Sequence, residues 1–145
     1  MNRKIVVEII SMLFIFLFVY AAVAKLLDVE KFWVQIGQSP ILTDIAWFVA
    51  WFIPIIEIVI SVLLVMPRFR LTGFLGAFGL MVLFTAYIIS ILQFSEHIPC
   101  ACGGVLQSLG WTQHLIFNIG FILLAVIGIV LHSREQKLSN QVIYQ

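Results

Sequence analysis

Apolar residues fill four long stretches of this chain, and shorter polar segments separate them. A helix of about 20 residues is about 30 Å long, which matches the hydrocarbon core of a bilayer. Open strands cannot satisfy their backbone groups in lipid. We therefore predict an all-α membrane protein, a four-transmembrane-helix bundle that forms a single integral membrane domain over residues 1–145, with spans at about 5–24, 45–66, 71–94 and 111–131.

The first apolar stretch has a second interpretation. Arg3 and Lys4 precede it, and the sequence at 22–24 (AVA) resembles the cleavage site of a signal peptide. The apolar run is longer than a usual signal core, which favours a membrane span.

A short amphipathic helix is expected after the first span. Asp28 is a suitable N-cap and Glu30 lies in the first turn. Apolar residues then recur at helical spacing until Gly37 and Pro40 end the pattern. We expect this helix at the membrane surface, with Trp33 at the level of the headgroups.

Composition supports burial in lipid. Hydrophobic residues make up 63% of the chain and charged residues only 10%, whereas a soluble domain carries about 25% charged residues. The net charge of +1 gives no sign of a nucleic-acid partner. Membrane lipid is the expected surrounding of the bundle.

Lys and Arg residues predict the orientation of the spans. Only Lys25 and Lys31 belong to the side that carries the segment 25–44. The opposite side would hold six: Arg3, Lys4, Arg68, Arg70, Arg134 and Lys137. Both termini are therefore expected in the cytoplasm, while the segment between the third and fourth spans faces outward, which in a bacterium is the oxidising periplasm.

Both cysteines of the chain, Cys100 and Cys102, lie in that outward segment. A disulfide across so short a ring closes almost no loop, so it stabilises little, and strained, exposed disulfides exchange readily. Thiol-disulfide exchange is the leading interpretation. Two alternatives stay open: a pair of buried unpaired thiols, and a copper or other metal site in which His97 joins the two cysteines and a nearby Met.

Several polar residues lie inside the expected spans. Glu57 is near the middle of the second span, where an ionisable group is either functional or paired, and Lys25 is the nearest cation by depth. His114 and Asn118 share one face of the fourth span with Trp111. A protonated His114 near the cysteines would lower a thiol pKa. Hydrogen bonding across helices is the alternative for His114 and Asn118.

Three motifs in this order resemble the MauE/DoxX family of redox-associated membrane proteins. They are the segment 24–28 (AKLLD), the Pro-x-x-Glu at 54–57 and the Cys-x-Cys-Gly-Gly at 100–104. Members of the family commonly have Arg-Asn in the fourth span, where this chain has Phe117 and Asn118. The resemblance implies a four-helix bundle of the bacterial inner membrane that takes part in periplasmic thiol chemistry with a thioredoxin-like partner. The layout is also similar to vitamin K epoxide reductases, but two cysteines leave no second, shuttling pair.

Together with the resemblance, these observations predict an inner-membrane thiol-disulfide redox protein that exchanges electrons between a periplasmic thioredoxin-like partner and a membrane acceptor. As an enzyme it would be a quinone-linked thiol-disulfide oxidoreductase. The catalytic residues would be Cys100, Cys102 and His114, while Lys25, Glu57 and Asn118 would support the bundle or handle protons. No motif shows a cofactor site, and a quinone among Phe84, Tyr87 and Trp111 is the candidate acceptor. A non-catalytic membrane subunit of a larger assembly is the alternative of another class.

Overall fold

The computed structural model describes residues 2–37, 42–94 and 111–145, and nearly all of them are helical. Four helices are long and apolar enough to cross a membrane, which confirms the predicted fold class. They are α1 (Arg3–Leu27), α3 (Ala46–Val65), α4 (Arg70–Phe94) and α5 (Trp111–Ile143), and the short α2 (Val29–Gly37) follows α1. Two single turns of 3-10 helix, η1 (Thr43–Ile45) and η2 (Pro67–Phe69), precede α3 and α4.

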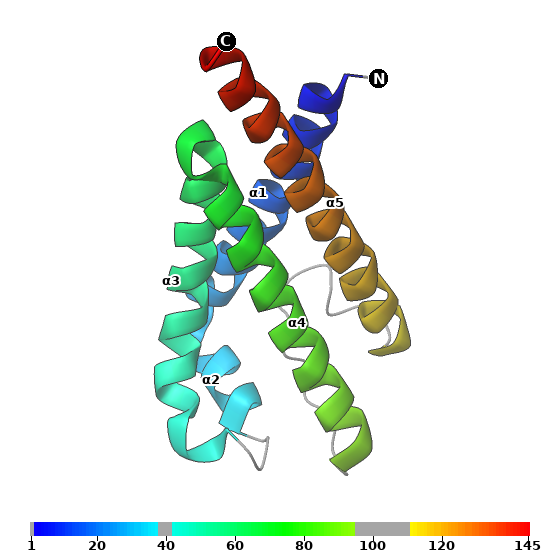
Figure 1. The fold of residues 1–145 in the computed structure, drawn as a ribbon. Coiled ribbons are helices and arrows are strands. Elements are labelled where there is room, and N and C mark those ends of the chain that lie inside the picture. The colour runs from blue at the N-terminus through cyan, green and yellow to red at the C-terminus, as the bar shows by residue number, and fades with distance from the viewer. Residues whose placement is uncertain (1, 38–41, 95–110) are drawn as a thin grey trace.

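The long helices alternate in direction (Figure 1). Both termini and the η2 turn lie at one end of the bundle, which we call the terminal end. α2 and the start of α3 lie at the opposite end, which we call the α2 end, and α4 finishes there. This alternation groups the termini with the basic η2 turn, as the orientation argument requires.

The apolar core is densest toward the terminal end. Phe14 is fully buried, and its ring lies 5.2 Å from that of Phe121 and 6.4 Å from that of Phe74, so one residue of α1 joins α4 and α5. Gly73 and Gly128 provide the close approach: a Cβ on Gly73 would lie 2.9 Å from the Leu64 side chain, and one on Gly128 would lie 2.8 Å from the Phe74 ring.

Three glycines of α4, Gly73, Gly76 and Gly79, are spaced three residues apart, which suits close approach to a neighbouring helix, and only the first two are used for it. Gly73 and Gly76 face α3, because a Cβ on Gly76 would lie 3.2 Å from Ile60, whereas a Cβ on Gly79 would meet nothing within 4 Å. The third glycine does not serve the close approach that its spacing suggests.

The amphipathic helix forms as predicted, with one difference. The backbone N–H of Lys31 donates to the Asp28 side chain at 3.2 Å, which caps the helix, and Trp33 is exposed. Phe32 and Ile36, however, are buried against Ala46 and Ala50 of α3. The apolar face of α2 thus packs on protein, so it covers the first turns of α3.

The C-terminal segment differs from its predicted end. The fourth apolar span is predicted to end near residue 131, and α5 continues beyond it to Ile143. Residues 132–143 contain no glycine or proline that would stop a helix, and Gln136 Nε2 lies 3.4 Å from His132 Nε2 one turn away. Good helix formers such as Glu135 and Lys137 extend the helix beyond the apolar part.

Candidate functional site

A buried ion pair joins α1 to α3. Lys25 Nζ donates to Glu57 Oε1 at 2.5 Å, and the two side chains are 3% and 0% exposed. Glu57 is the twelfth of the 20 residues of α3, so α1 ends beside the middle of α3. The sequence counted Lys25 on the outward side and named it as the nearest cation to Glu57 by depth; the structure pairs the two residues directly and buries Lys25 inside the bundle, where α2 covers it. Without Lys25, the outward side carries only Lys31 against six Lys and Arg residues on the opposite side, so the charge difference between the two sides is larger.

Two aromatic rings complete the surroundings of the Lys25 ammonium. Nζ lies 5.1 Å from the centroid of the Phe84 ring and 5.6 Å from that of Phe32. Ring faces attract a cation at such distances, most strongly where water is excluded. One carboxylate and two rings from α2, α3 and α4 thus hold a charge that would be costly in bare hydrocarbon.

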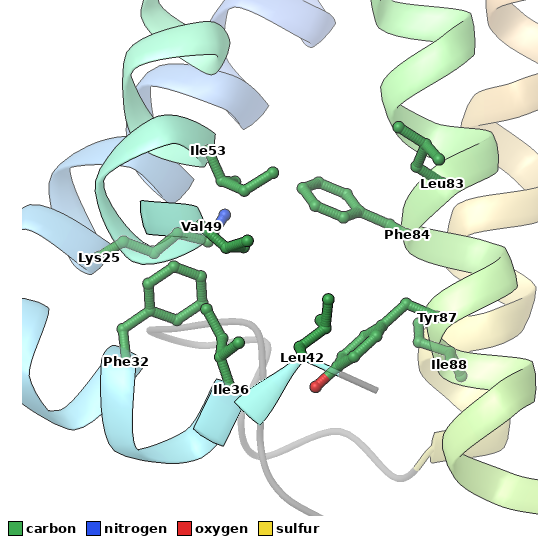
Figure 2. A pocket seen from close by; sticks show the side chains of 10 residues that line it. All are labelled: Lys25, Phe32, Ile36, Leu42, Val49, Ile53, Leu83, Phe84, Tyr87 and Ile88. Atoms are coloured by element: carbon green, nitrogen blue, oxygen red, sulfur yellow. The ribbon is translucent and has the colours of Figure 1, made fainter. Parts of the chain in front are cut away.

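Next to this charge lies a cavity of about 260 Å³ between α2, α3 and α4. Figure 2 shows Phe84 and Tyr87 on one side and Lys25 with Phe32 on the other. The remaining walls are aliphatic: Ile36, Leu42, Val49, Ile53, Leu83 and Ile88. A cavity with apolar walls and a few polar groups at its edge is typical of sites for small hydrophobic molecules.

A second, smaller cavity of about 30 Å³ adjoins the ion pair. His114 and Asn118 of α5 line it together with Lys25 and Glu57. Both α5 side chains are buried, at 7% and 5% exposure. The structure thus brings five of the predicted site residues to one small space, since Phe84 lines it too. The sequence had placed His114 and Asn118 only on a common helix face.

The other predicted site residues have separate outcomes. Phe84 and Tyr87 line the larger cavity, whereas Trp111 begins α5. Cys100, Cys102 and His97 lie outside the described residues, so the thiol pair and the metal alternative stay predictions. In the part of the chain that the structure describes, no group of three or more His, Cys, Asp or Glu side chains could hold a metal ion.

Sequence reasoning missed the α2 and α3 walls of the cavity. Phe32 and Ile36 were recognised only as the apolar face of a surface helix, and nothing marked Val49 or Ile53. These residues look like ordinary lipid-facing or core positions in the sequence. The available signal was the short α2 helix directly before a span. Its bulky apolar face has to be covered by protein or by lipid.

The fold and the buried ion pair define a multi-pass membrane protein of four long helices with an internal charged site. The family model described as methylamine utilisation protein MauE matches residues 3–131. The chain therefore belongs to the MauE family. It is 32% identical over 99 residues to the methylamine utilization protein MauE of Paracoccus denitrificans, an alignment that covers 66% of this chain and 53% of that protein. The chain thus spans about half the length of this relative, and no solved structure matches it.

Proposed function

We propose that this protein is a thiol-disulfide redox protein of the bacterial inner membrane. Cys100 and Cys102 exchange electrons with a periplasmic thioredoxin-like protein on one side and with a membrane acceptor on the other. The carrying observation is the 260 Å³ cavity beside the buried Lys25, because a membrane redox step needs a place for a lipid-soluble acceptor. The MauE relative is named for methylamine utilisation, and a role in maturing a protein of such a system fits this chemistry.

The position of the helix ends supports the link between cavity and cysteines. α4 finishes with Phe94 and α5 begins with Trp111, and these residues flank the segment that carries both sulfurs. The C-terminal end of α4 lies at the α2 end of the bundle (Figure 1). The larger cavity lies toward the same end, between α2 and the second half of α4. The segment that carries both sulfurs therefore begins at the end of the bundle toward which the cavity lies.

The proposed reaction moves two electrons and two protons. A thiolate of the partner attacks one sulfur of the Cys100–Cys102 disulfide, a mixed disulfide forms, and the second thiol of the partner releases the reduced pair. The dithiol then returns to the disulfide as the membrane acceptor takes the electron pair and two protons. The opposite direction uses the same steps reversed. His114, three residues into α5 from Trp111, would favour the thiolate when protonated.

A quinone is the acceptor that fits these walls. Its ring and apolar tail match the aliphatic and aromatic lining, and its carbonyl oxygen accepts a hydrogen bond from the Lys25 ammonium. Phe84 and Tyr87 are the ring neighbours that we propose for it.

Orientation follows from charge. The six Lys and Arg residues of the cytoplasmic group belong to the termini, η2 and the adjoining turns of α4 and α5, which meet at the terminal end (Figure 1). The proposal places this end in the cytoplasm and the α2 end toward the periplasm. Labelling of single added cysteines from outside the cell, in a background without Cys100 and Cys102, tests the orientation.

Trapping of the mixed disulfide tests the exchange itself. A Cys102→Ser variant lacks the resolving sulfur, so a partner attached to Cys100 should persist as an adduct that a reductant dissolves. The Cys100→Ser variant is the matched trap for the opposite order of attack, and the double Ser variant is the control that captures nothing. If neither single variant captures a partner and the pair never changes its oxidation state in membranes, the redox function is wrong and the subunit alternative gains support.

A further inference from the structure

The smaller cavity adjoins the larger one across two shared side chains. Lys25 and Phe84 line both cavities, and Figure 2 shows these two on opposite sides of the larger one. The smaller cavity is also lined by Glu57 of α3 and Asn118 of α5, among mostly apolar side chains. Lys25 thus borders both spaces, and the smaller one brings further polar groups beside the ion pair.

Two polar atoms at this small cavity lack a hydrogen-bond partner within the described ranges. Glu57 Oε1 accepts a hydrogen bond from Lys25, but Glu57 Oε2 has no hydrogen-bond partner among the described residues, and neither does Asn118 Nδ2. Both side chains are more than nine-tenths buried. A carboxylate oxygen accepts and an amide nitrogen donates, so the two atoms are complementary, and leaving either unsatisfied in a membrane interior costs free energy.

A water molecule has both the donors and the acceptors that these two atoms need. A buried water needs about 10–15 Å³ of accessible volume and two to four polar partners, and the cavity of about 30 Å³ exceeds that volume. We propose that it is a bound-water site, in which water accepts from Asn118 Nδ2 and donates to Glu57 Oε2, and that Glu57 and this water pass the protons of the redox step. The second half rests on the proposed function.

The proton balance gives the relay its role. Oxidation of the dithiol releases two protons at the sulfurs, and the electron pair reduces a quinone, whose two oxygens take up two protons. For one of the two protons, Lys25 would give its proton to the acceptor, the water would pass a proton released by the dithiol to the Glu57 carboxylate, and Glu57 would hand it to the neutral Lys25 amine. The second released proton balances the second oxygen of the acceptor. Each group returns to its starting state after the transfer, and no further reactant is needed.

The water site is tested without any redox reaction. Infrared spectra of the purified protein in nanodiscs, recorded in H₂¹⁶O and H₂¹⁸O, should show an isotope-sensitive band of a tightly held water. Asn118→Leu, of similar size but without a donor, should remove the band, and Asn118→Ser, which keeps a donor, should retain it. The exposed neighbour variant Ile119→Leu is the control. A wild-type protein without the band, or an Asn118→Leu variant that keeps it, overturns the site, including in a background with both cysteines changed to Ser.

The proton role is tested by the rate at which a short-chain benzoquinone oxidises the thiol pair. Asn118→Leu and Glu57→Gln should slow this oxidation at least tenfold and change its pH profile, with the KM for quinone altered less than twofold, and Asn118→Ser should restore most of the rate. Unchanged rates in both slow variants overturn the relay but leave the proposed function standing. If the wild-type thiols are not oxidised while the water band is present, the proposed function fails and the water site stands.

Discussion

The two ends of this bundle differ in how tightly they are packed and in whether they hold buried charge. Toward the terminal end, glycines press against side chains of neighbouring helices, and Phe14 joins two other rings at its centre. Toward the α2 end, an ion pair, two ring faces and a cavity of about 260 Å³ lie inside the fold. Close packing supplies the stability of a membrane bundle, so one end is able to support the open and charged structure of the other.

Loss of one ion-pair partner should give the largest effect, and it tests whether the α2 end depends on its charges. Lys25→Met leaves Glu57 buried without its cation, which we expect to destabilise the protein by about 3–5 kcal/mol. Unfolding by SDS in mixed micelles measures the change. The double variant Lys25→Met with Glu57→Leu should recover most of the stability, because a well-packed apolar pair avoids the desolvation cost. No recovery would show that the ion pair itself holds α1 to α3.

A methyl group added toward the terminal end should have the next largest effect on stability. In Gly128→Ala the new Cβ would lie 2.8 Å from the Phe74 ring, so the ring or the helix must shift. We expect a loss of about 1–3 kcal/mol and a lower melting temperature in detergent. Gly120→Ala on the same helix meets nothing within 4 Å and is the matched control, which should be neutral or slightly stabilising. Equal effects would remove the contrast between the ends.

Added volume should be tolerated differently at the two ends. Ala77 is fully buried in the packed core, and Ala77→Val should cost about 1–3 kcal/mol through overpacking. Val49 borders the large cavity, and the larger Val49→Phe change should cost less than about 1 kcal/mol because the new ring has space. Val49→Phe should nevertheless reduce benzoquinone binding, measured by equilibrium dialysis. A strongly unstable Val49→Phe variant would show that the cavity is not available space.

Removal of residues 139–145 should have the smallest effect. All of these side chains are exposed, so the free energy of unfolding should change by less than about 0.5 kcal/mol. The SDS titration measures it, with the full chain as the reference. A larger loss of stability would mean that the polar end of α5 also stabilises the bundle, and not its apolar part alone.

The sequence predicted individual helices better than the contacts between them. Apolar length set the four spans, and the Asp28 cap with the spacing of Phe32 and Ile36 set α2, because each signal lies within one helix. Burial of Lys25 was missed because its depth depends on where α2 packs, which involves α3. The cavity was missed for the same reason: its walls come from four helices, and Val49 or Ile53 alone carries no sign of it.

Sequence reasoning identified the polar residues of the candidate site but not their arrangement. Glu57 stands out because a carboxylate inside an apolar run needs an explanation, and His114 with Asn118 stand out by spacing. Their meeting around one small cavity depends on how α5 faces α3, and residue spacing says nothing about that.

The long final helix has a practical consequence. Its 33 residues extend for about 50 Å, against about 30 Å of hydrocarbon, so about 20 Å of rigid rod leaves the bilayer. A fluorescent protein joined to this rod without a flexible linker would stand clear of the lipid and tumble with the bundle. Polarised light would then report how the whole molecule tilts and turns in its native membrane.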